Sequence, residues 1–367
     1  MDAQAALATA PGRPLTVDSV HLEELRPDEI RVRIAGAGVC HSAILARDQQ
    51  YPVPLPAVLG DEGAGVVEAV GTAVRSLAIG DHVVLGFNSC GSCLHCRAGR
   101  PSSCQEFFGH NFGGYRSDGS SPIRWNGQPA AGCFFGQSSF AAHVHVSERI
   151  AVKVPTDAPI ELLGPLGCGL MTGAGAVLEV LRPRPGDSFT VFGTGAVGFA
   201  GLLAAKASGA TTIIAVDVSP QRLELARDLG ATHTVNSAHT DPVTEIRTIT
   251  DNFGADYAFD AVGITDVFVQ MTESLAPRGH GALAGAPPQG ERAGVDIGRL
   301  LFTQQRLSMV LEGSAVPHEL IPRLVRLYQA GLFPFDRLVS TYPLDEINTA
   351  LADAESGATV KPIITFS

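Results

Sequence analysis

The sequence predicts an α/β protein in which a β-rich domain is followed by a doubly wound parallel sheet. Its 367 residues, 45% of them hydrophobic, are enough to bury more than one core, which favours two domains. The first part of the chain consists of short strand-like runs punctuated by Gly and Pro. From Asp187 onward, apolar strands alternate with helical patterns, as expected of βαβ units on a parallel sheet.

Alternation and β-branching indicate the strands of the first part. Ile30–Ile34 alternates apolar with polar residues, which is typical of a strand with one buried face. Gly65–Val70 and His82–Leu85 are short runs rich in valine. We assign residues 1–165 to the β-rich domain, with a cysteine-containing lobe at residues 88–105.

The parallel sheet is expected over residues 166–311, where strand and helix patterns alternate. Ser219 is a suitable N-cap for a helix that opens with Pro220 and closes before Gly230. The other elements expected here are strands at Ser188–Phe192, Thr211–Val218, Tyr257–Val262 and Gly281–Gly285, and a helix at Ala196–Ser208.

The pattern changes once more at the C-terminal end. Ile321–Ala330 has helical periodicity. Short strands come after it, the last of them at Ile363–Phe366. We expect residues 312–367 to return to the first domain.

A glycine-rich turn follows the first strand of the expected parallel sheet. It reads G-x-G-x-x-G and contains Gly193, Gly195, Val197 and Gly198. Such glycines allow a tight turn and close approach of a pyrophosphate, which the following helix N-terminus binds through its free N–H groups. Asp217 ends the next strand, where a carboxylate accepts hydrogen bonds from the adenosine ribose and repels a 2′-phosphate. The combination predicts a dinucleotide site that prefers NAD to NADP.

Cysteine spacing predicts a metal site rather than disulfides. The chain has 7 cysteines, an odd number, and a group of them falls on one short loop. Four thiolates this close can complete a tetrahedral zinc shell, which leaves no position for a substrate and indicates a structural zinc. The expected ligands are Cys90, Cys93, Cys96 and Cys104.

Composition excludes several other classes of function. Acidic residues outnumber basic ones, 37 against 26, and no Lys/Arg cluster is interleaved with aromatic residues, so nucleic acid is not an expected partner. No apolar run approaches the ~20 residues of a membrane span. The N-terminal stretch lacks the basic start of a secretory signal. We therefore expect a cytoplasmic protein without a membrane partner.

Several ordered sequence blocks carry a family resemblance. They are Gly38–Ser42, Tyr51–Pro56, Gly60–Val67, the four-cysteine lobe, Phe134–Phe140, Gly164–Gly169 and Gly285–Pro288. Through these blocks the chain resembles the zinc-containing medium-chain alcohol dehydrogenases along nearly its whole length, and the bacterial benzyl (aryl) alcohol dehydrogenases most closely. The resemblance implies a GroES-like catalytic domain, a Rossmann NAD-binding domain, a small alcohol or aldehyde as substrate, and a homodimer or homotetramer.

The resemblance also implies a catalytic zinc, held in the family by Cys, His and Cys. The cysteines correspond to Cys40 and Cys168, but Asp61 occupies the position of the His. The family's Asp that orients this His is Ala43 here. Asp61 could ligate zinc directly, could bind it poorly with Glu62 or water completing the shell, or could mark a site without zinc. We favour direct ligation, because a ligating carboxylate does not need the second carboxylate that an imidazole does.

Further roles follow from the resemblance alone. Ser42 corresponds to the hydroxyl that bonds the alcohol oxygen and starts a proton relay, with a merely buried hydroxyl as the alternative. His41 and Lys361 correspond to residues at the cofactor pyrophosphate, with a solvated surface charge as the alternative. Arg222 and Val262 are expected at the cofactor. The residues that fall at substrate-pocket positions, where core packing is the alternative, are Phe87, Phe134, Phe135 and Leu311.

Together these features predict a zinc-dependent oxidoreductase that interconverts a primary alcohol, aryl or allylic, and its aldehyde with NAD. A reductase of a polarised C=C or C=N bond, lacking the catalytic zinc because of Asp61, is the alternative. A redox-silent NAD-binding scaffold is a third possibility, against which Cys40, Ser42 and Cys168 argue.

Overall fold

The computed structural model describes residues 1–288 and 290–366, and these divide into two compact units. Unit 1 contains Met1–Gly169, Val316–Arg326 and the chain from Asp336 onward, and unit 2 contains Leu170–Ala315 and Leu327–Phe335. We expected the whole of residues 312–367 in the first domain. Residues 312–315 and 327–335 belong to unit 2 instead, and residues 166–169, expected in the second domain, belong to unit 1. Within 327–335 the rings of Tyr328 and Phe335 pack with centroids 4.7 Å apart.

Unit 1 is built mainly on antiparallel β-structure, as its alternating strands indicate. In one sheet the strand order is β4-β1-β2-β7-β8, and in the other it is β10-β6-β5-β3-β18-β17, with β9 also paired to β3. The strands of the first sheet are β1 (Asp2–Ala8), β2 (Thr16–Leu22), β4 (Ala57–Val58), β7 (Ile123–Trp125) and β8 (Gln128–Ala130). Those of the second are β3 (Glu29–Gly38), β5 (Gly63–Val70), β6 (His82–Leu85), β9 (His143–Ser147), β10 (Ala151–Val154), β17 (Val339–Pro343) and β18 (Lys361–Thr365).

Strand β3 lies between β5, β9 and β18 and shows why this sheet forms. Ile30, Val32 and Ile34 are each no more than 1% exposed, while Arg33 between them points to solvent. This is the period-two pattern of a strand with one buried face. The helices associated with this unit are α1 (His41–Arg47), α2 (Leu94–Arg97), α3 (Phe107–Phe112) and α11 (Ile347–Ser356), and the unit boundaries fall in α4 (Gly169–Gly175) and α10 (Pro317–Gln329).

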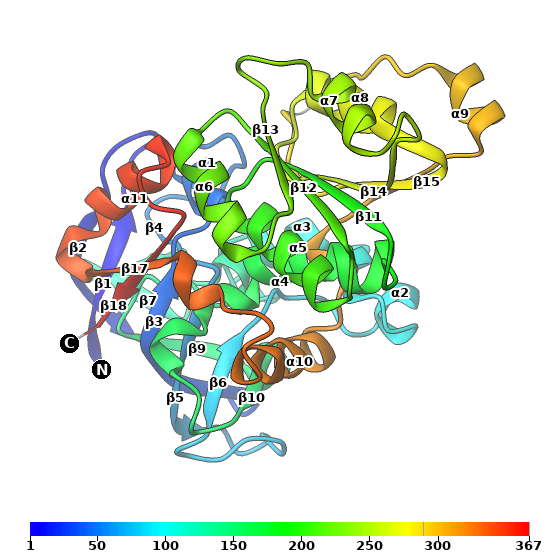
Figure 1. The fold of residues 1–367 in the computed structure, drawn as a ribbon. Helices are drawn as coiled ribbons and strands as arrows, with labels where there is room; N and C mark the ends of the chain where they lie inside the picture. Colours follow the sequence, from blue (N-terminus) through cyan, green and yellow to red (C-terminus); the bar gives the residue numbers. More distant parts are fainter. Residues whose placement is uncertain (289, 367) are drawn as a thin grey trace. The chain divides into compact units, whose positions relative to one another are not determined.

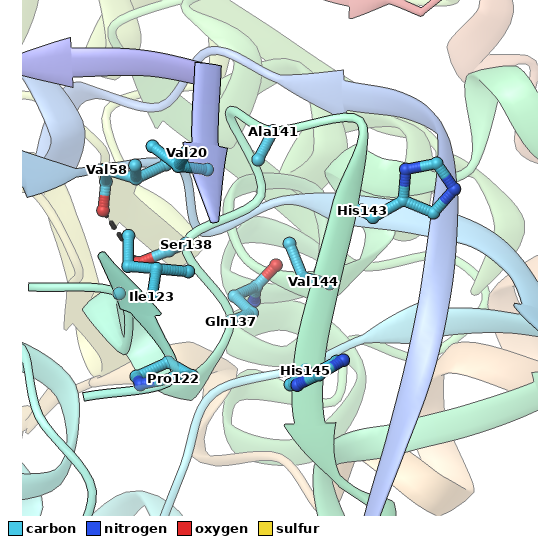
Figure 2. A pocket seen from close by; sticks show the side chains of 11 residues that line it. Val20, Val58, Pro122, Ile123, Gln137, Ser138, Ala141, His143, Val144 and His145 are labelled. Atoms are coloured by element: carbon cyan, nitrogen blue, oxygen red, sulfur yellow. Dashed lines mark hydrogen bonds between the residues drawn. The ribbon is translucent and has the colours of Figure 1, made fainter. Parts of the chain in front are cut away.

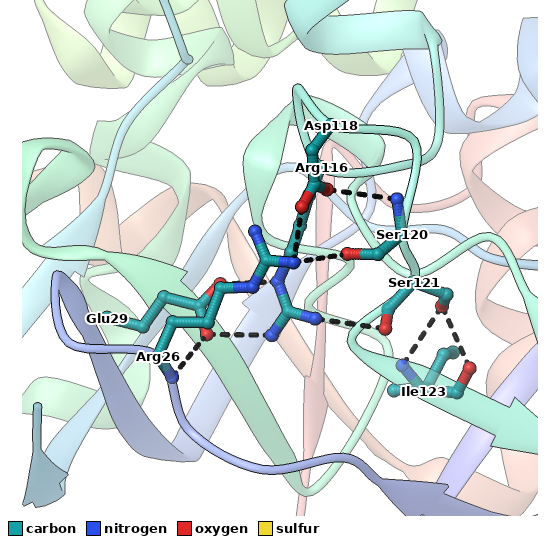
Figure 3. Close-up of polar contacts among 7 residues, drawn as sticks. All are labelled: Arg26, Glu29, Arg116, Asp118, Ser120, Ser121 and Ile123. Atoms are coloured by element: carbon teal, nitrogen blue, oxygen red, sulfur yellow. Dashed lines mark hydrogen bonds and ion pairs between the residues drawn. The ribbon is translucent and has the colours of Figure 1, made fainter.

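A buried ion pair fastens the segment before β7 to the start of β3. Arg116 donates from Nε and Nη2 to the two carboxylate oxygens of Glu29, at 2.6 and 2.7 Å (Figure 3). Arg26 donates to Asp118 at 2.6 Å and to Ser120 at 2.7 Å in the same network. The bidentate geometry fixes both groups, because the planar guanidinium matches the carboxylate.

Unit 2 is a parallel sheet with strand order β13-β12-β11-β14-β15-β16 (Figure 1). The order reverses beside β11, which is the strand that leads into the glycine-rich turn. Its strands are β11 (Ser188–Phe192), β12 (Thr212–Asp217), β13 (His233–Asn236), β14 (Ala255–Asp260), β15 (Leu275–Leu283) and β16 (Arg306–Met309). Its helices are α5 (Ala196–Ala207), α6 (Pro220–Leu229), α7 (Pro242–Ile249), α8 (Thr265–Ser274) and α9 (Ile297–Thr303).

Helices cover both faces of this parallel sheet. Phe192 of β11 packs in one cluster with Ile246 of α7 and Met271 of α8. Its neighbour Val191 points to the opposite face, where α5 approaches so closely that a Cβ on Gly198 would lie 3.3 Å from Val191. The sheet is therefore doubly wound, and its strands are buried on both sides. None of the helices in the described residues is long and apolar enough to cross a membrane.

Candidate active site and cofactor site

Cys40, Asp61 and Cys168 come together in unit 1, although they are far apart in the sequence. Cys40 immediately precedes α1, Asp61 precedes β5, and Cys168 precedes α4. One ligand atom from each residue lies within 4.8 Å of the others, and the two Sγ atoms are 3.8 Å apart. Two thiolates bound to one tetrahedral zinc at ~2.3 Å stand about 3.8 Å apart, so the sulfur spacing fits that metal.

The two oxygens of the Asp61 carboxylate have different surroundings. Oδ2 accepts a 2.5 Å hydrogen bond from the Ser42 hydroxyl. Oδ1 is buried and has no hydrogen-bond partner among the described residues. Burial, followed by the nearby negative charge of Glu62, raises the pKa of Asp61 to about 6. A buried, unpartnered carboxylate oxygen is costly unless a cation or donor satisfies it.

The donor set suits zinc. Two thiolates and one carboxylate oxygen are all common zinc ligands, and three protein ligands leave a fourth coordination position for a substrate oxygen. Oδ1 of Asp61 is the oxygen available for this role, because Oδ2 is already bonded to Ser42.

Glu62 and Lys361 form a buried ion pair, whereas the sequence suggested a possible zinc ligand for Glu62 and a pyrophosphate contact for Lys361. Lys361, only 3% exposed, donates to both Glu62 oxygens at 3.0 and 2.9 Å and to the Val39 carbonyl at 3.0 Å. All three ammonium hydrogens are thereby used, so Lys361 is neither a surface charge nor free to bind a pyrophosphate. Burial alone would lower the pKa of Lys361, but the charge and hydrogen bond of Glu62, together with the charges of Cys40 and Cys168, outweigh burial and raise the pKa to about 12. Glu62 also accepts from the Gly169 N–H at 2.9 Å, so its oxygens are committed to this ion pair rather than to a metal.

Sequence reasoning did not assign a role to Gln137, which the structure places against the Asp61 segment. Its Nε2 donates to the Asp61 carbonyl at 3.0 Å, and its Oε1 accepts from the Gly63 N–H at 2.9 Å. Gln137 is fully buried beside Ser138, whose hydroxyl donates to the Val58 carbonyl at 2.6 Å (Figure 2). These bonds hold the backbone on both sides of Asp61. Only the block Phe134–Phe140 marked this region in the sequence, and no local pattern pointed to the glutamine.

The four-cysteine lobe also gathers its ligands. One atom from each of the four thiols lies within 4.8 Å of the others, and the Cys90 and Cys96 sulfurs are 3.8 Å apart. Backbone N–H groups of Ser92 and Cys93 lower the pKa of Cys90 to about 5. A thiol that ionises this readily is prepared to bind a metal, since the thiolate is the ligand form. The members of the cluster are Cys90, Cys93, Cys96 and Cys104.

In unit 2 the glycine-rich turn has the geometry that a dinucleotide site needs. Gly193 has φ +83°, and a Cβ there would lie 2.4 Å from the Val262 side chain. A Cβ on Gly198 would lie 1.8 Å from the Gly193 carbonyl, whereas one on Gly195 would meet no atom within 4 Å. The first and third glycines are thus required for packing, and the second leaves open space next to the start of α5. Val197 lies in the first turn of that helix.

Asp217 ends β12, and its carboxylate receives three hydrogen bonds. The N–H and the hydroxyl of Thr194 each donate to Oδ2 at 2.7 Å, and the Ser219 N–H donates to Oδ1 at 2.9 Å. Asp217 is 7% exposed and Thr194 is fully buried. Ser219 also caps α6, as predicted, with its hydroxyl accepting from the Arg222 N–H. The sequence indicated Asp217 but gave no reason to single out Thr194.

The predicted pocket aromatics of unit 1 form a packed cluster. Phe134 and Phe135 are 0% and 3% exposed, with ring centroids 5.0 Å apart, and Phe87 is 4% exposed. Phe112 joins them in edge-to-face contact with both Phe134 and Phe135. The three predicted phenylalanines are therefore buried side chains, and their role at a substrate pocket stays a prediction. His41 is exposed in the first turn of α1, and Leu311 in unit 2 is 46% exposed.

Comparison with known proteins places these features in a family. The family model for the alcohol dehydrogenase GroES-like domain matches residues 26–156, and that for zinc-binding dehydrogenase matches residues 196–330. The chain is 43% identical over 368 residues to a geraniol dehydrogenase of Castellaniella defragrans, covering 100% of this chain and 98% of that protein.

Solved structures agree in fold over the whole chain. An alcohol dehydrogenase zinc-binding domain protein from Burkholderia ambifaria matches with TM-score 0.98 and 49% identity, covering 100% of this chain and 99% of that one. Benzyl alcohol dehydrogenase from Acinetobacter calcoaceticus matches with TM-score 0.96 and 46% identity, covering 100% of both chains. The predicted GroES-like and Rossmann fold class is confirmed.

Proposed function

The chain belongs to the zinc-containing medium-chain alcohol dehydrogenase family, and from this premise we propose that it interconverts an allylic or aryl primary alcohol and its aldehyde with NAD. The observation that carries the proposal is the cluster of Cys40, Asp61 and Cys168, with one buried carboxylate oxygen left for a metal. Geraniol is an allylic alcohol and benzyl alcohol an aryl one, and relatives named for each support the substrate class.

The residues of unit 1 bind and orient the alcohol. A zinc ion held by Cys40, Asp61 and Cys168 supplies Lewis acidity toward the alcohol oxygen. The Ser42 hydroxyl donates a hydrogen bond to Asp61 Oδ2, so its oxygen meets a substrate hydroxyl as an acceptor. When Ser42 takes up the alcohol proton, its own proton passes to Asp61 Oδ2 along this bond. The buried Glu62–Lys361 pair and the Gln137 bonds fix the backbone around these groups.

Unit 2 supplies the cofactor site in this proposal. The free N–H groups at the start of α5 receive the pyrophosphate, beside the open space at Gly195. Asp217 accepts a hydrogen bond from the adenosine ribose and repels a 2′-phosphate, which gives the preference for NAD. Bound NAD⁺ would supply the acceptor for the hydride of the carbinol carbon, while the alcohol proton is passed through Ser42 to Asp61.

Metal content and substrate range test the proposal together. Elemental analysis of the purified protein is expected to give two zincs per chain, one for each cysteine-containing cluster. NAD⁺ reduction is expected with geraniol, cinnamyl alcohol and benzyl alcohol, and to be slower with ethanol. Asp61→Asn is expected to retain only the zinc of the four-cysteine lobe and to lose turnover. One zinc per chain in the unmodified protein, with no alcohol oxidised, would instead favour the reductase of C=C or C=N bonds.

A further inference from the structure

The Thr194 side chain forms a contact with Asp217 that the glycine motif does not require. Thr194 is the residue between Gly193 and Gly195, a position that the G-x-G-x-x-G pattern leaves open. Its hydroxyl donates to Asp217 Oδ2 at 2.7 Å, the same oxygen that accepts from its backbone N–H. Both residues are buried, Thr194 completely and Asp217 to all but 7%.

These bonds leave Asp217 little remaining acceptor capacity. An ionised carboxylate has about four acceptor positions. Thr194 fills two on Oδ2, and the Ser219 N–H fills one on Oδ1 at 2.9 Å. One position on Oδ1 is then left for a ligand. The carboxylate is also held in one orientation, because both of its oxygens are bonded to fixed groups.

We propose that Thr194 is a specificity-determining residue, which positions the Asp217 carboxylate so that the site accepts an adenosine ribose with a free 2′-hydroxyl and rejects a 2′-phosphate. The inference rests on the proposed NAD-dependent function and extends it to a residue outside the glycine and aspartate pattern. A fixed carboxylate offers an acceptor to a ribose hydroxyl but only repulsion to a phosphate.

Loss of the Thr194 hydroxyl weakens this discrimination. Asp217 Oδ2 then keeps only the backbone bond, so two N–H groups hold the carboxylate in place of three donors and its charge is held less firmly at the ribose. Arg222, in the first turn of α6, is the basic residue nearest to Asp217 along the sequence. It is the side chain that we expect a 2′-phosphate to meet when the Asp217 carboxylate is held less firmly. The hydrogen bond lost is one to a charged group, the Asp217 carboxylate. The free energy of such a bond corresponds to a change of about tenfold in the ratio Kd(NADP⁺)/Kd(NAD⁺).

Calorimetric binding of NAD⁺ and NADP⁺ to the full-length zinc-loaded protein tests the inference without using turnover. Thr194→Val keeps the shape of the side chain and removes the hydroxyl, and is expected to lower the Kd(NADP⁺)/Kd(NAD⁺) ratio about tenfold. Thr194→Ser keeps the hydroxyl and should retain the ratio of the unmodified protein. Thr194→Ala removes the same hydroxyl without the β-branched bulk and serves if the valine variant does not fold.

Thr190 provides the matched control. It lies on the same strand β11, is fully buried, and its hydroxyl has no hydrogen-bond partner within the described part of the chain. Thr190→Val should therefore leave both dissociation constants unchanged. In an Asp217→Asn background, Thr194→Val should have no further effect on the ratio, because Thr194 acts through the carboxylate charge.

The outcomes separate the inference from the function on which it rests. If the unmodified protein prefers NAD⁺ and Thr194→Val keeps that preference in full, the inference is wrong and the proposed cofactor stands. The inference is also wrong if the effect of Thr194→Val is equally large in the Asp217→Asn background. If the unmodified protein binds NADP⁺ at least as tightly as NAD⁺, the proposed cofactor fails, and the inference with it.

Discussion

The hydroxyl of Ser42 donates a 2.5 Å hydrogen bond to Oδ2 of Asp61, so each of these two residues fixes the orientation of the other in the candidate active site. The bond occupies Oδ2, while Oδ1 has no hydrogen-bond partner among the described residues, and the carboxylate lies within 4.8 Å of the sulfurs of Cys40 and Cys168. It also fixes the Ser42 proton, which makes the serine oxygen an acceptor for a substrate hydroxyl.

Ser42→Ala tests this role directly. The variant keeps every proposed zinc ligand, so we expect the zinc content of the unmodified protein together with a fall in kcat of about 10²-fold, since the alcohol proton has lost its acceptor. Ser42→Thr retains the hydroxyl and should preserve most of the activity. Steady-state kinetics and elemental analysis on the same samples provide the check, and a Ser42→Ala enzyme with unchanged kcat contradicts the role.

Lys361→Met tests the buried ion pair. The substitution leaves the Glu62 carboxylate fully buried without its cation, which is expected to lower the free energy of unfolding by about 3–5 kcal/mol. The double variant Lys361→Met/Glu62→Gln removes both charges and should recover most of that loss. Urea unfolding followed by circular dichroism measures both. Equal stability of the single variant and the unmodified protein would show that the pair contributes little.

His145 is expected to make stability depend on pH. It is 5% exposed beside a cavity of ≈ 10 Å³, neither ring nitrogen has a partner among the residues described, and burial lowers its pKa to about 4 (Figure 2). The unfolded chain binds the proton near pH 6.5, so between pH 6.5 and 4 it holds more protons than the folded chain. The contribution is therefore complete above pH 6.5 and decreases by about 3 kcal/mol as the pH falls to 4.

Denaturant unfolding at pH 7 and at pH 4.5 measures this contribution. His145→Phe should lose much less stability between the two values than the unmodified protein, because it cannot take up the proton. His21→Gln, which changes an exposed histidine, should behave like the unmodified protein. An identical pH dependence in the His145 variant would assign the acid sensitivity to other groups.

Chelation of zinc is expected to open the four-cysteine lobe. Arg97 is exposed at the end of α2 inside this lobe, where the backbone is held by the surrounding cysteines. Without metal the loop loses its crosslink, so trypsin should cut after Arg97 several-fold faster in the presence of a chelator. Mass spectrometry of the fragments identifies the cut. Cleavage after Arg292, exposed in unit 2, should not change, and Arg97→Gln should remove the new fragment.

Local pattern was sufficient for many of the elements. The predicted strands His82–Leu85 and Ser188–Phe192 match β6 and β11 residue for residue, because both are short apolar runs bounded by turn residues. Strand β15 begins at Leu275 instead of Gly281. Pro277 and the glycines of this strand look like a turn in the sequence, and only pairing with β14 makes them part of the sheet.

By itself the sequence determined the glycine turn, the aspartate after it and the four closely spaced cysteines, since each depends on residues near one another in the chain. Tertiary structure alone decided that Lys361 binds Glu62, that Gln137 holds the backbone around Asp61, and that Thr194 bonds to Asp217. A side chain's hydrogen-bond partner is set by what the fold brings within 3 Å of it, often from a distant part of the chain, and no local periodicity carries that information.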